Sequence, residues 1–125
     1  MLKKIFFLII SGLLLINCQK LDTSNPDNML IVSSQLGDIN RVKLAIAKGA
    51  NINAQDENGS TALHWAVFYE YGDIVKLLLM HGANPFVKDK NGITPIDVAR
   101  INRKFTMIKI LEKYVKERKS TSQPN

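Results

Sequence analysis

A segment that repeats with a period of 33 residues limits the folds open to this chain. Residues 49–63 read GANINAQDENGSTAL and residues 82–96 read GANPFVKDKNGITPI, with seven identities in register. A unit of this length is one supersecondary motif, which buries its apolar face only by stacking on a neighbouring copy. The period therefore predicts a repeat architecture.

The residue types inside each unit indicate its local structure. Gly49 and Gly82 follow apolar runs of helical character, where a left-handed helix cap favours glycine. Thr61 and Thr94 follow a cluster of turn residues and can each cap a new helix through the hydroxyl group. Pro95 then suits the first helical position. Each unit is predicted to contain a turn, a short helix, a second helix and a loop.

Three segments carry a resemblance to a known family. They are TALHWA at 61–66, TPIDVA at 94–99 and GDINRVKLAIAKGANINAQD at 37–56. In these segments the chain resembles the ankyrin-repeat family, whose unit is a β-hairpin-like turn followed by two antiparallel helices. The resemblance implies an all-α solenoid of about three helix-turn-helix units over residues 28–115. Its first unit lacks the signature, as terminal repeats often do.

Two features of the pattern differ between repeats. Glu70 and Arg103 stand where repeat one has Gly37, the glycine that joins the two helices in this family. Asp97 stands at the position of His64, so we expect a different side-chain hydrogen bond there. In the middle repeat we expect an apolar core between the helices. Its expected members are Leu63, Ala66, Val75, Leu78 and Leu79, with Trp65 and Ile74 against the neighbouring repeats.

The N-terminus has the layout of a secretory signal peptide, assigned to residues 1–17. A positive start, MLKK, precedes an apolar run at residues 5–16, which is too short to span a bilayer comfortably. LINC at 15–18 resembles a bacterial lipobox, which implies that Cys18 becomes the lipidated mature N-terminus. The alternatives are an ordinary exported protein, or an uncleaved anchor, with Cys18 as an incidental thiol. Residues 18–27 then form a tether and residues 116–125 a polar tail.

Charge is concentrated at the C-terminal end of the chain. The formal net charge is +6, and the segment from Arg100 to Lys119 holds eight basic residues against two acidic ones. Such a segment can lie against anionic lipid or an acidic partner. It can also be the solvated outer face of a terminal repeat, and we favour this interpretation. Nucleic acid is not expected as a partner, because the chain is expected to be exported.

The motifs of catalysis are missing from the sequence. The two histidines, His64 and His81, have no metal-ligand spacing, and there is no GxSxG elbow, phosphate loop or HExxH motif. His64 is interpreted as a structural capping residue, and Asp56 and Asp89 as turn residues. We expect no enzymatic activity, no cofactor and no metal.

Noncovalent binding is the remaining function, and repeat geometry assigns residues to it. The resemblance implies a concave face made of hairpin tips and first helices, which holds a partner protein in this family. The residues predicted for that face are Gln55, Glu57, Asn58, Ser60, Phe68, Tyr69, Tyr71, Lys88, Lys90, Asn91, Ile93, Ile101 and Asn102. Phe68, Tyr69 and Tyr71 stand out, because clustered aromatic residues commonly anchor interfaces.

The sequence thus predicts a monomeric protein-binding module at the bacterial envelope, on the periplasmic or outer-membrane face, anchored by a lipid at Cys18. Two alternatives remain open. One is a membrane-surface structural protein that uses its basic C-terminal helix, and the other is an inhibitor or protective subunit of an envelope enzyme.

Overall fold

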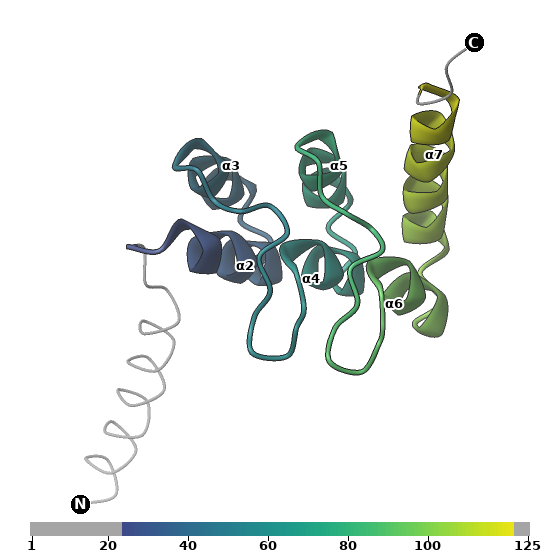
Figure 1. Ribbon diagram of the computed structural model, residues 1–125, viewed down its shortest axis with the longest axis horizontal. Coiled ribbons are helices and arrows are strands. Elements are labelled where there is room, and N and C mark those ends of the chain that lie inside the picture. The colour runs from purple at the N-terminus through teal and green to yellow at the C-terminus, as the bar shows by residue number, and fades with distance from the viewer. Residues whose placement is uncertain (1–23, 122–125) are drawn as a thin grey trace, which may run out of the picture.

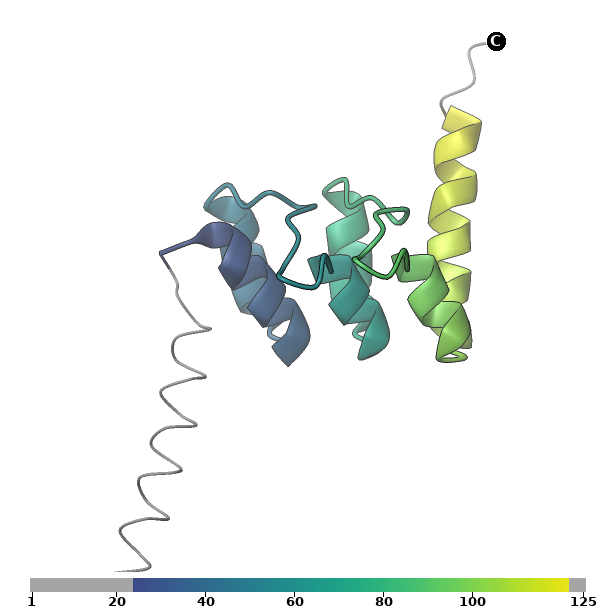
Figure 2. The same ribbon diagram turned by 60° about the horizontal axis from the view of Figure 1, so that its bottom comes forward.

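The computed structural model describes residues 24–121, which form helices in two rows joined by two hairpin-like loops (Figure 1). The first helices of the three repeats form one row, and the second helices form the other (Figure 2). The first row holds α2 (Pro26–Leu36), α4 (Ala62–Phe68) and α6 (Pro95–Ile101), and the second holds α3 (Ile39–Ala47), α5 (Gly72–Met80) and α7 (Phe105–Thr121). The predicted all-α repeat fold is confirmed.

The hairpin-like loops contain almost no strand structure. Within residues 24–121 the one strand-like pairing is a single antiparallel bridge between Gln55 and Thr61. None of the helices in this part of the chain has the length and apolar character needed to cross a membrane.

Threonine caps start the first helices of repeats two and three. The Thr61 hydroxyl accepts a hydrogen bond from the His64 backbone N–H, and His64 Nδ1 accepts one from the Thr61 backbone N–H at 3.0 Å. In repeat three, Thr94 Oγ1 accepts from the Asp97 N–H at 3.2 Å and Asp97 Oδ2 accepts from the Thr94 N–H at 3.1 Å. The Asp97 carboxylate thus takes the place of His64 Nδ1 as the acceptor. Both capping boxes satisfy backbone N–H groups that the helix leaves unpaired.

The turn between the two helices of each repeat requires a left-handed residue. Gly37 has φ 74°, and the equivalent Glu70 and Arg103 have φ 59° and 54°. A residue with a Cβ is strained in this region by roughly 1 kcal/mol. The glycine is needed in repeat one for a second reason, since a Cβ there would lie 2.8 Å from the Tyr71 ring.

Both ends of the described array extend beyond the limits predicted from the sequence. Helix α2 begins at Pro26 because Asn25 caps it, accepting a hydrogen bond from the Asp27 N–H at 2.9 Å. Residues 26 and 27, assigned to the tether, are therefore helical. Helix α7 continues to Thr121, so residues 116–121 are helical and not part of a tail. Good helix formers and a Lys113–Glu117 ion pair in the i, i+4 geometry support this extension.

A single apolar core runs between the two rows of helices. All five core residues predicted for the middle repeat are buried, as is Ile74, while Trp65 is half-buried. The core continues into the outer repeats through Leu30 and Val42 at one end and Leu111 at the other. Stacking of the three helix pairs therefore buries one continuous core.

Side chains and backbone of neighbouring hairpins also hold the repeats together. Asn53 Oδ1 accepts from the Asn84 N–H at 2.8 Å, and Gln55 Nε2 donates to the Lys88 carbonyl at 3.2 Å. The Lys90 N–H donates to the Asn58 carbonyl at 3.0 Å. These bonds fix the spacing between the two hairpins.

Gly59 lies at a point of close approach between the two hairpins. A Cβ at Gly59 would lie 2.9 Å from the Lys90 backbone nitrogen, whereas one at the equivalent Gly92 would meet nothing within 4 Å. The two glycines have nearly the same φ, 75° and 77°. The two glycines therefore differ in whether a neighbouring hairpin lies against them.

We predict that Gly59→Ala destabilises the protein more than Gly92→Ala does. Both substitutions place alanine in a left-handed conformation, which costs about 1 kcal/mol. Gly59→Ala also forces the hairpins apart, which adds roughly 1–3 kcal/mol of overpacking. Urea unfolding of the two variants and the wild type measures the difference. Equal losses at the two positions would show that hairpin contact does not contribute to stability.

Candidate functional site

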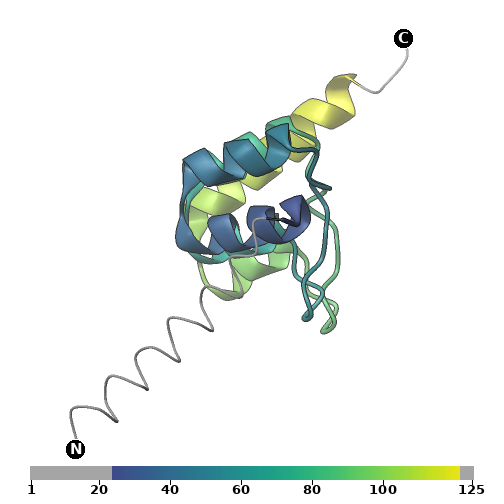
Figure 3. The same ribbon diagram turned by 90° about the vertical axis from the view of Figure 1, so that its left-hand side faces the viewer.

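The two hairpins lie on one side of the first helices and extend beyond them (Figure 3). One hairpin precedes α4 and the other precedes α6, so their tips and the exposed parts of the first helices share one surface. We call this surface the concave face. It is the surface that the sequence predicted for partner binding.

An aspartate organises each hairpin tip. Asp56 Oδ1 accepts from the Asn58 and Ser60 N–H groups at 2.9 and 3.0 Å. Asp89 Oδ1 accepts from the Asn91 and Ile93 N–H groups at 2.8 and 2.9 Å. The interpretation of both aspartates as turn residues is confirmed.

The predicted hairpin residues differ in how far they reach solvent. Those exposed at the tips are Gln55, Glu57, Asn58, Lys88, Lys90 and Asn91. Ile93 is half-buried, and Ser60 is buried, with its backbone bonded to Asp56 in both directions. Ser60 is therefore not available to a partner, and its assignment to the binding face is corrected.

Trp65 connects the first hairpin to helix α4. Its indole N–H donates to Asp56 Oδ2 at 2.8 Å, so the same carboxylate holds both the hairpin tip and the ring. The ring lines a recess of about 600 Å³ together with Ile31 and Gln35 of α2 and Gln55 of the hairpin. The sequence interpretation gave Trp65 a packing role alone. The sequence signal for this hydrogen bond was Asp56, the aspartate nine residues before the tryptophan.

Four aromatic rings form a connected cluster at the end of α4. Tyr69 stacks against Trp65 and Tyr71, with ring centroids 6.3 and 5.8 Å away, and Phe68 meets Tyr69 edge-on at 5.0 Å. Tyr71 is half-buried and its ring covers Gly37. The predicted aromatic cluster thus exists, but Phe68 and Tyr69 are the two strongly exposed members.

Exposed apolar side chains continue this cluster along the ends of the first helices and the start of α7. Leu36, Phe68 and Ile101 end α2, α4 and α6, Tyr69 follows α4, and Phe105 begins α7. These side chains are 42 to 68% exposed. We call these five residues the apolar edge. Leu36 and Phe105 were missed from the sequence, although Leu36 lies one period before Tyr69. Asn102 is also exposed beside Ile101, and its amide donates to the Val98 carbonyl.

His64 holds the second hairpin against α4. Its Nδ1 accepts from Thr61 and its Nε2 lies 2.9 Å from the Ile93 carbonyl, which requires a neutral ring with the proton on Nε2. Burial lowers the pKa of His64, although the Ile93 carbonyl and two nearby aspartates favour the charged form. The predicted structural role is confirmed.

Asp97 occupies the equivalent position in repeat three, in a different electrostatic setting. The backbone hydrogen bond from Thr94, and then that from the Thr94 side chain, lower the pKa of its carboxyl group. Its charged form is favoured at neutral pH. No group of three or more histidine, cysteine, aspartate or glutamate residues within 24–121 could hold a metal ion.

Comparison with known families agrees with the repeat geometry. A model of ankyrin repeats in three copies matches residues 4–89 and 29–122. No curated protein matches the sequence.

We predict that His64 makes the stability of the protein fall as the pH is lowered through the unfolded pKa of histidine, about 6.5. Because its pKa is lowered in the folded state, the stabilisation is complete above the unfolded pKa of about 6.5 and is lost as the pH falls through the folded pKa. His64→Gln should flatten this dependence, as measured by urea unfolding at several pH values. His81 is present in both proteins and cancels in the comparison. Parallel pH profiles would contradict the proposed neutral His64.

Proposed function

The chain belongs to the ankyrin-repeat family, and on that premise we propose that it is an exported, lipid-anchored module that binds a partner protein at the bacterial envelope. Ankyrin repeats indicate protein–protein interaction, and proteins of this family are typically not enzymes. The protein binds as a monomer, without a cofactor.

The apolar edge is the observation that supports partner binding on the concave face. Exposed apolar side chains that lie together on a protein surface are typical of interaction sites. In this protein the edge crosses all three repeats, from Leu36 on α2 to Ile101 on α6. Such a row matches an elongated partner surface better than a small ligand.

The aromatic residues of the edge are suited to act as anchors. Stacking on Trp65 and Tyr71 fixes the Tyr69 ring, and the edge-on contact with Tyr69 restrains Phe68. A ring that is already fixed loses little conformational freedom on binding. The hairpin tips then add polar contacts through Glu57, Asn58 and Lys90. We expect a partner that covers Phe68 and Tyr69 with apolar side chains and meets the tips with polar groups.

The N-terminal sequence supports the envelope part of the proposal. A positive start, an apolar run and LINC at 15–18 favour export and lipidation of Cys18. These residues lie outside the part of the chain that the structure describes. A lipid on Cys18 would hold the concave face close to a membrane, where envelope proteins are available as partners.

We predict that replacing both Phe68 and Tyr69 by alanine lowers partner recovery at least about tenfold, because interface anchors contribute about 2 kcal/mol or more each. The tagged chain is expressed in a bacterial host, crosslinked in the intact cells and purified from detergent extracts, and copurified proteins are quantified by mass spectrometry. Met80→Ala is the matched control, since Met80 is 81% exposed but lies on α5 in the other row of helices. The concave face is excluded if the double variant keeps its partner, or if Met80→Ala loses it equally.

We predict that Cys18→Ala abolishes membrane attachment. The wild-type chain should begin at Cys18, carry the mass of added acyl chains and enter the detergent phase, whereas the variant should stay in the aqueous phase. Intact mass spectrometry and detergent partitioning measure both properties. A wild-type chain that begins elsewhere and remains in the aqueous phase would disprove lipidation but leave the concave face as a binding site.

A further inference from the structure

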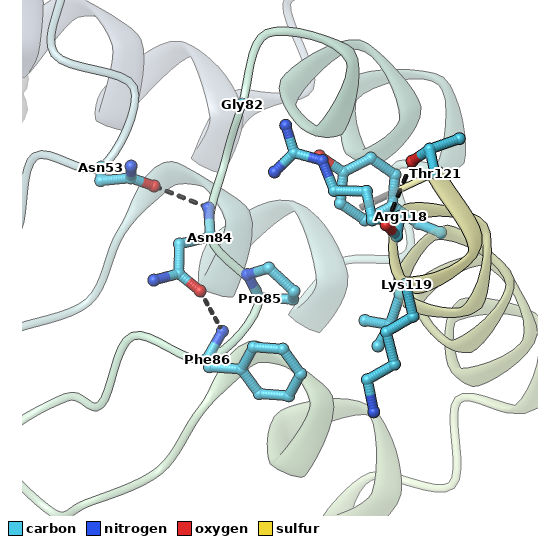
Figure 4. Close-up of a pocket in the computed structure, with 10 residues that line it drawn as sticks. Asn53, Gly82, Asn84, Pro85, Phe86, Arg118, Lys119 and Thr121 are labelled. Carbon is cyan, nitrogen blue, oxygen red and sulfur yellow. Dashed lines mark hydrogen bonds between the residues drawn. The ribbon is translucent and has the colours of Figure 1, made fainter. Parts of the chain in front are cut away.

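Helix α7 extends beyond the stack formed by the other second helices. Helices α3 and α5 end at Ala47 and Met80, and the equivalent position in α7 is Lys113. Residues 114–121 continue the helix for about two more turns, or roughly 12 Å. This overhang faces the loop between Gly82 and Phe86 (Figure 4).

Two neighbouring hollows lie along the overhang. One, of about 740 Å³, separates the loop at residues 82–86 from Tyr114 and Arg118. The other, of about 380 Å³, lies between α6 and α7, and both are lined by Phe86, Val115 and Lys119. We call this region the C-terminal trough. Its apolar floor includes the Phe86 side chain, which is 55% exposed.

Positive charge surrounds this apolar floor. The cationic residues that line the two hollows are Arg100, Lys116, Arg118 and Lys119, and the acidic lining residue is Glu112, whose Oε1 lies 3.5 Å from the Arg100 guanidinium. The cationic excess therefore persists after this ion pair is counted. Charge complementarity favours an anionic occupant.

Arg118 is positioned to receive a carboxylate. Its guanidinium carbon lies 5.3 Å from the centroid of the Tyr114 ring, so a cation–π contact restrains the side chain beside the trough (Figure 4). Within residues 24–121 none of the ion pairs involves Arg118. A restrained guanidinium can bind a carboxylate through two hydrogen bonds.

The trough is not shaped to receive another repeat of the same kind. Asn53 accepts a hydrogen bond from the next repeat, but the residue one period later is Phe86, whose ring cannot do so. Gln55, which donates to the next hairpin, is likewise replaced by Lys88. The second hairpin therefore presents an aromatic ring and a cationic side chain at the positions where the first hairpin presents amides that bond to the next repeat.

We propose that the C-terminal trough is a second binding site, which takes an acidic peptide segment. The segment places an aromatic or aliphatic side chain on Phe86 and a carboxylate on Arg118. This site is separate from the apolar edge on the concave face, so each can be tested without the other. An acidic peptide fits better than a flat anionic membrane, because Phe86 and Arg118 line a hollow between two structural elements.

The test measures binding of short peptides to the full chain purified in a non-ionic detergent. The probe is a fluorescent six-residue peptide, Glu-Asp-Phe-Glu-Asp-Leu, and its control is the uncharged Gln-Asn-Phe-Gln-Asn-Leu. Fluorescence anisotropy should show at least about tenfold tighter binding of the acidic peptide. Arg118→Gln and Phe86→Asn should each weaken that binding at least about tenfold.

A matched substitution separates this site from general attraction to a basic helix. Lys109→Gln removes one exposed charge from α7 outside the trough, as Arg118→Gln removes one inside it, and should change peptide affinity less than about twofold. Circular dichroism checks that every variant keeps its helices. The proposal is overturned if the two peptides bind alike, or if the lysine variant loses as much affinity as Arg118→Gln.

Vesicles of phosphatidylglycerol provide a further test, in which they are mixed with the Cys18→Ala chain in buffer without detergent, so that no lipid anchor inserts. The proposal expects binding to vesicles to be weak and unaffected by Phe86→Asn. If vesicles bind and the acidic peptide does not, α7 is a membrane-surface helix and the trough proposal is wrong. Failure of these peptide experiments would leave the concave face untouched, since neither Phe86 nor Arg118 belongs to it.

Discussion

Hydrogen bonds from one repeat to the backbone of the next determine the arrangement of this protein. His64, Gln55 and Asn53 each reach across a repeat boundary and bond to a backbone group of the second hairpin. The helices alone could bury their apolar surface at several relative positions, because apolar packing is not directional. The hairpin contacts are directional. They therefore set the spacing at which the first helices, and the side chains that they expose, follow one another.

The third repeat has the same backbone but different outward-facing chemistry. One period after Asn53, Gln55 and His64 stand Phe86, Lys88 and Asp97. The Asp97 carboxylate accepts a hydrogen bond within its own helix cap, from the Thr94 N–H. Helix α7 then continues past the stack and faces the loop that carries Phe86. The end of the array thus becomes a distinct surface with an apolar floor and a cationic border. A single fold thus presents two chemically different surfaces.

The two faces also differ in how their side chains are held. On the concave face, Trp65 is tied to Asp56 and serves as a base for Tyr69, so hairpin, helix and exposed ring form one rigid unit. In the trough, Arg118 is restrained through a cation–π contact with the Tyr114 ring. A rigid aromatic surface suits a folded partner protein, and a restrained cation beside an apolar floor suits a short charged segment.

The sequence by itself determined the repeat, its period and most of its local structure, because glycine turns, threonine caps and apolar spacing act over a few residues. It also identified Phe68, Tyr69, Ile101 and the hairpin tips as surface residues. The tertiary structure alone decided that Ser60 is buried, that Tyr71 covers Gly37, and that Leu36 and Phe105 join the apolar edge. It also decided that α7 overhangs the loop at Phe86. These outcomes depend on contacts between residues far apart in the chain, and local pattern carries no information on which neighbour covers a given side chain.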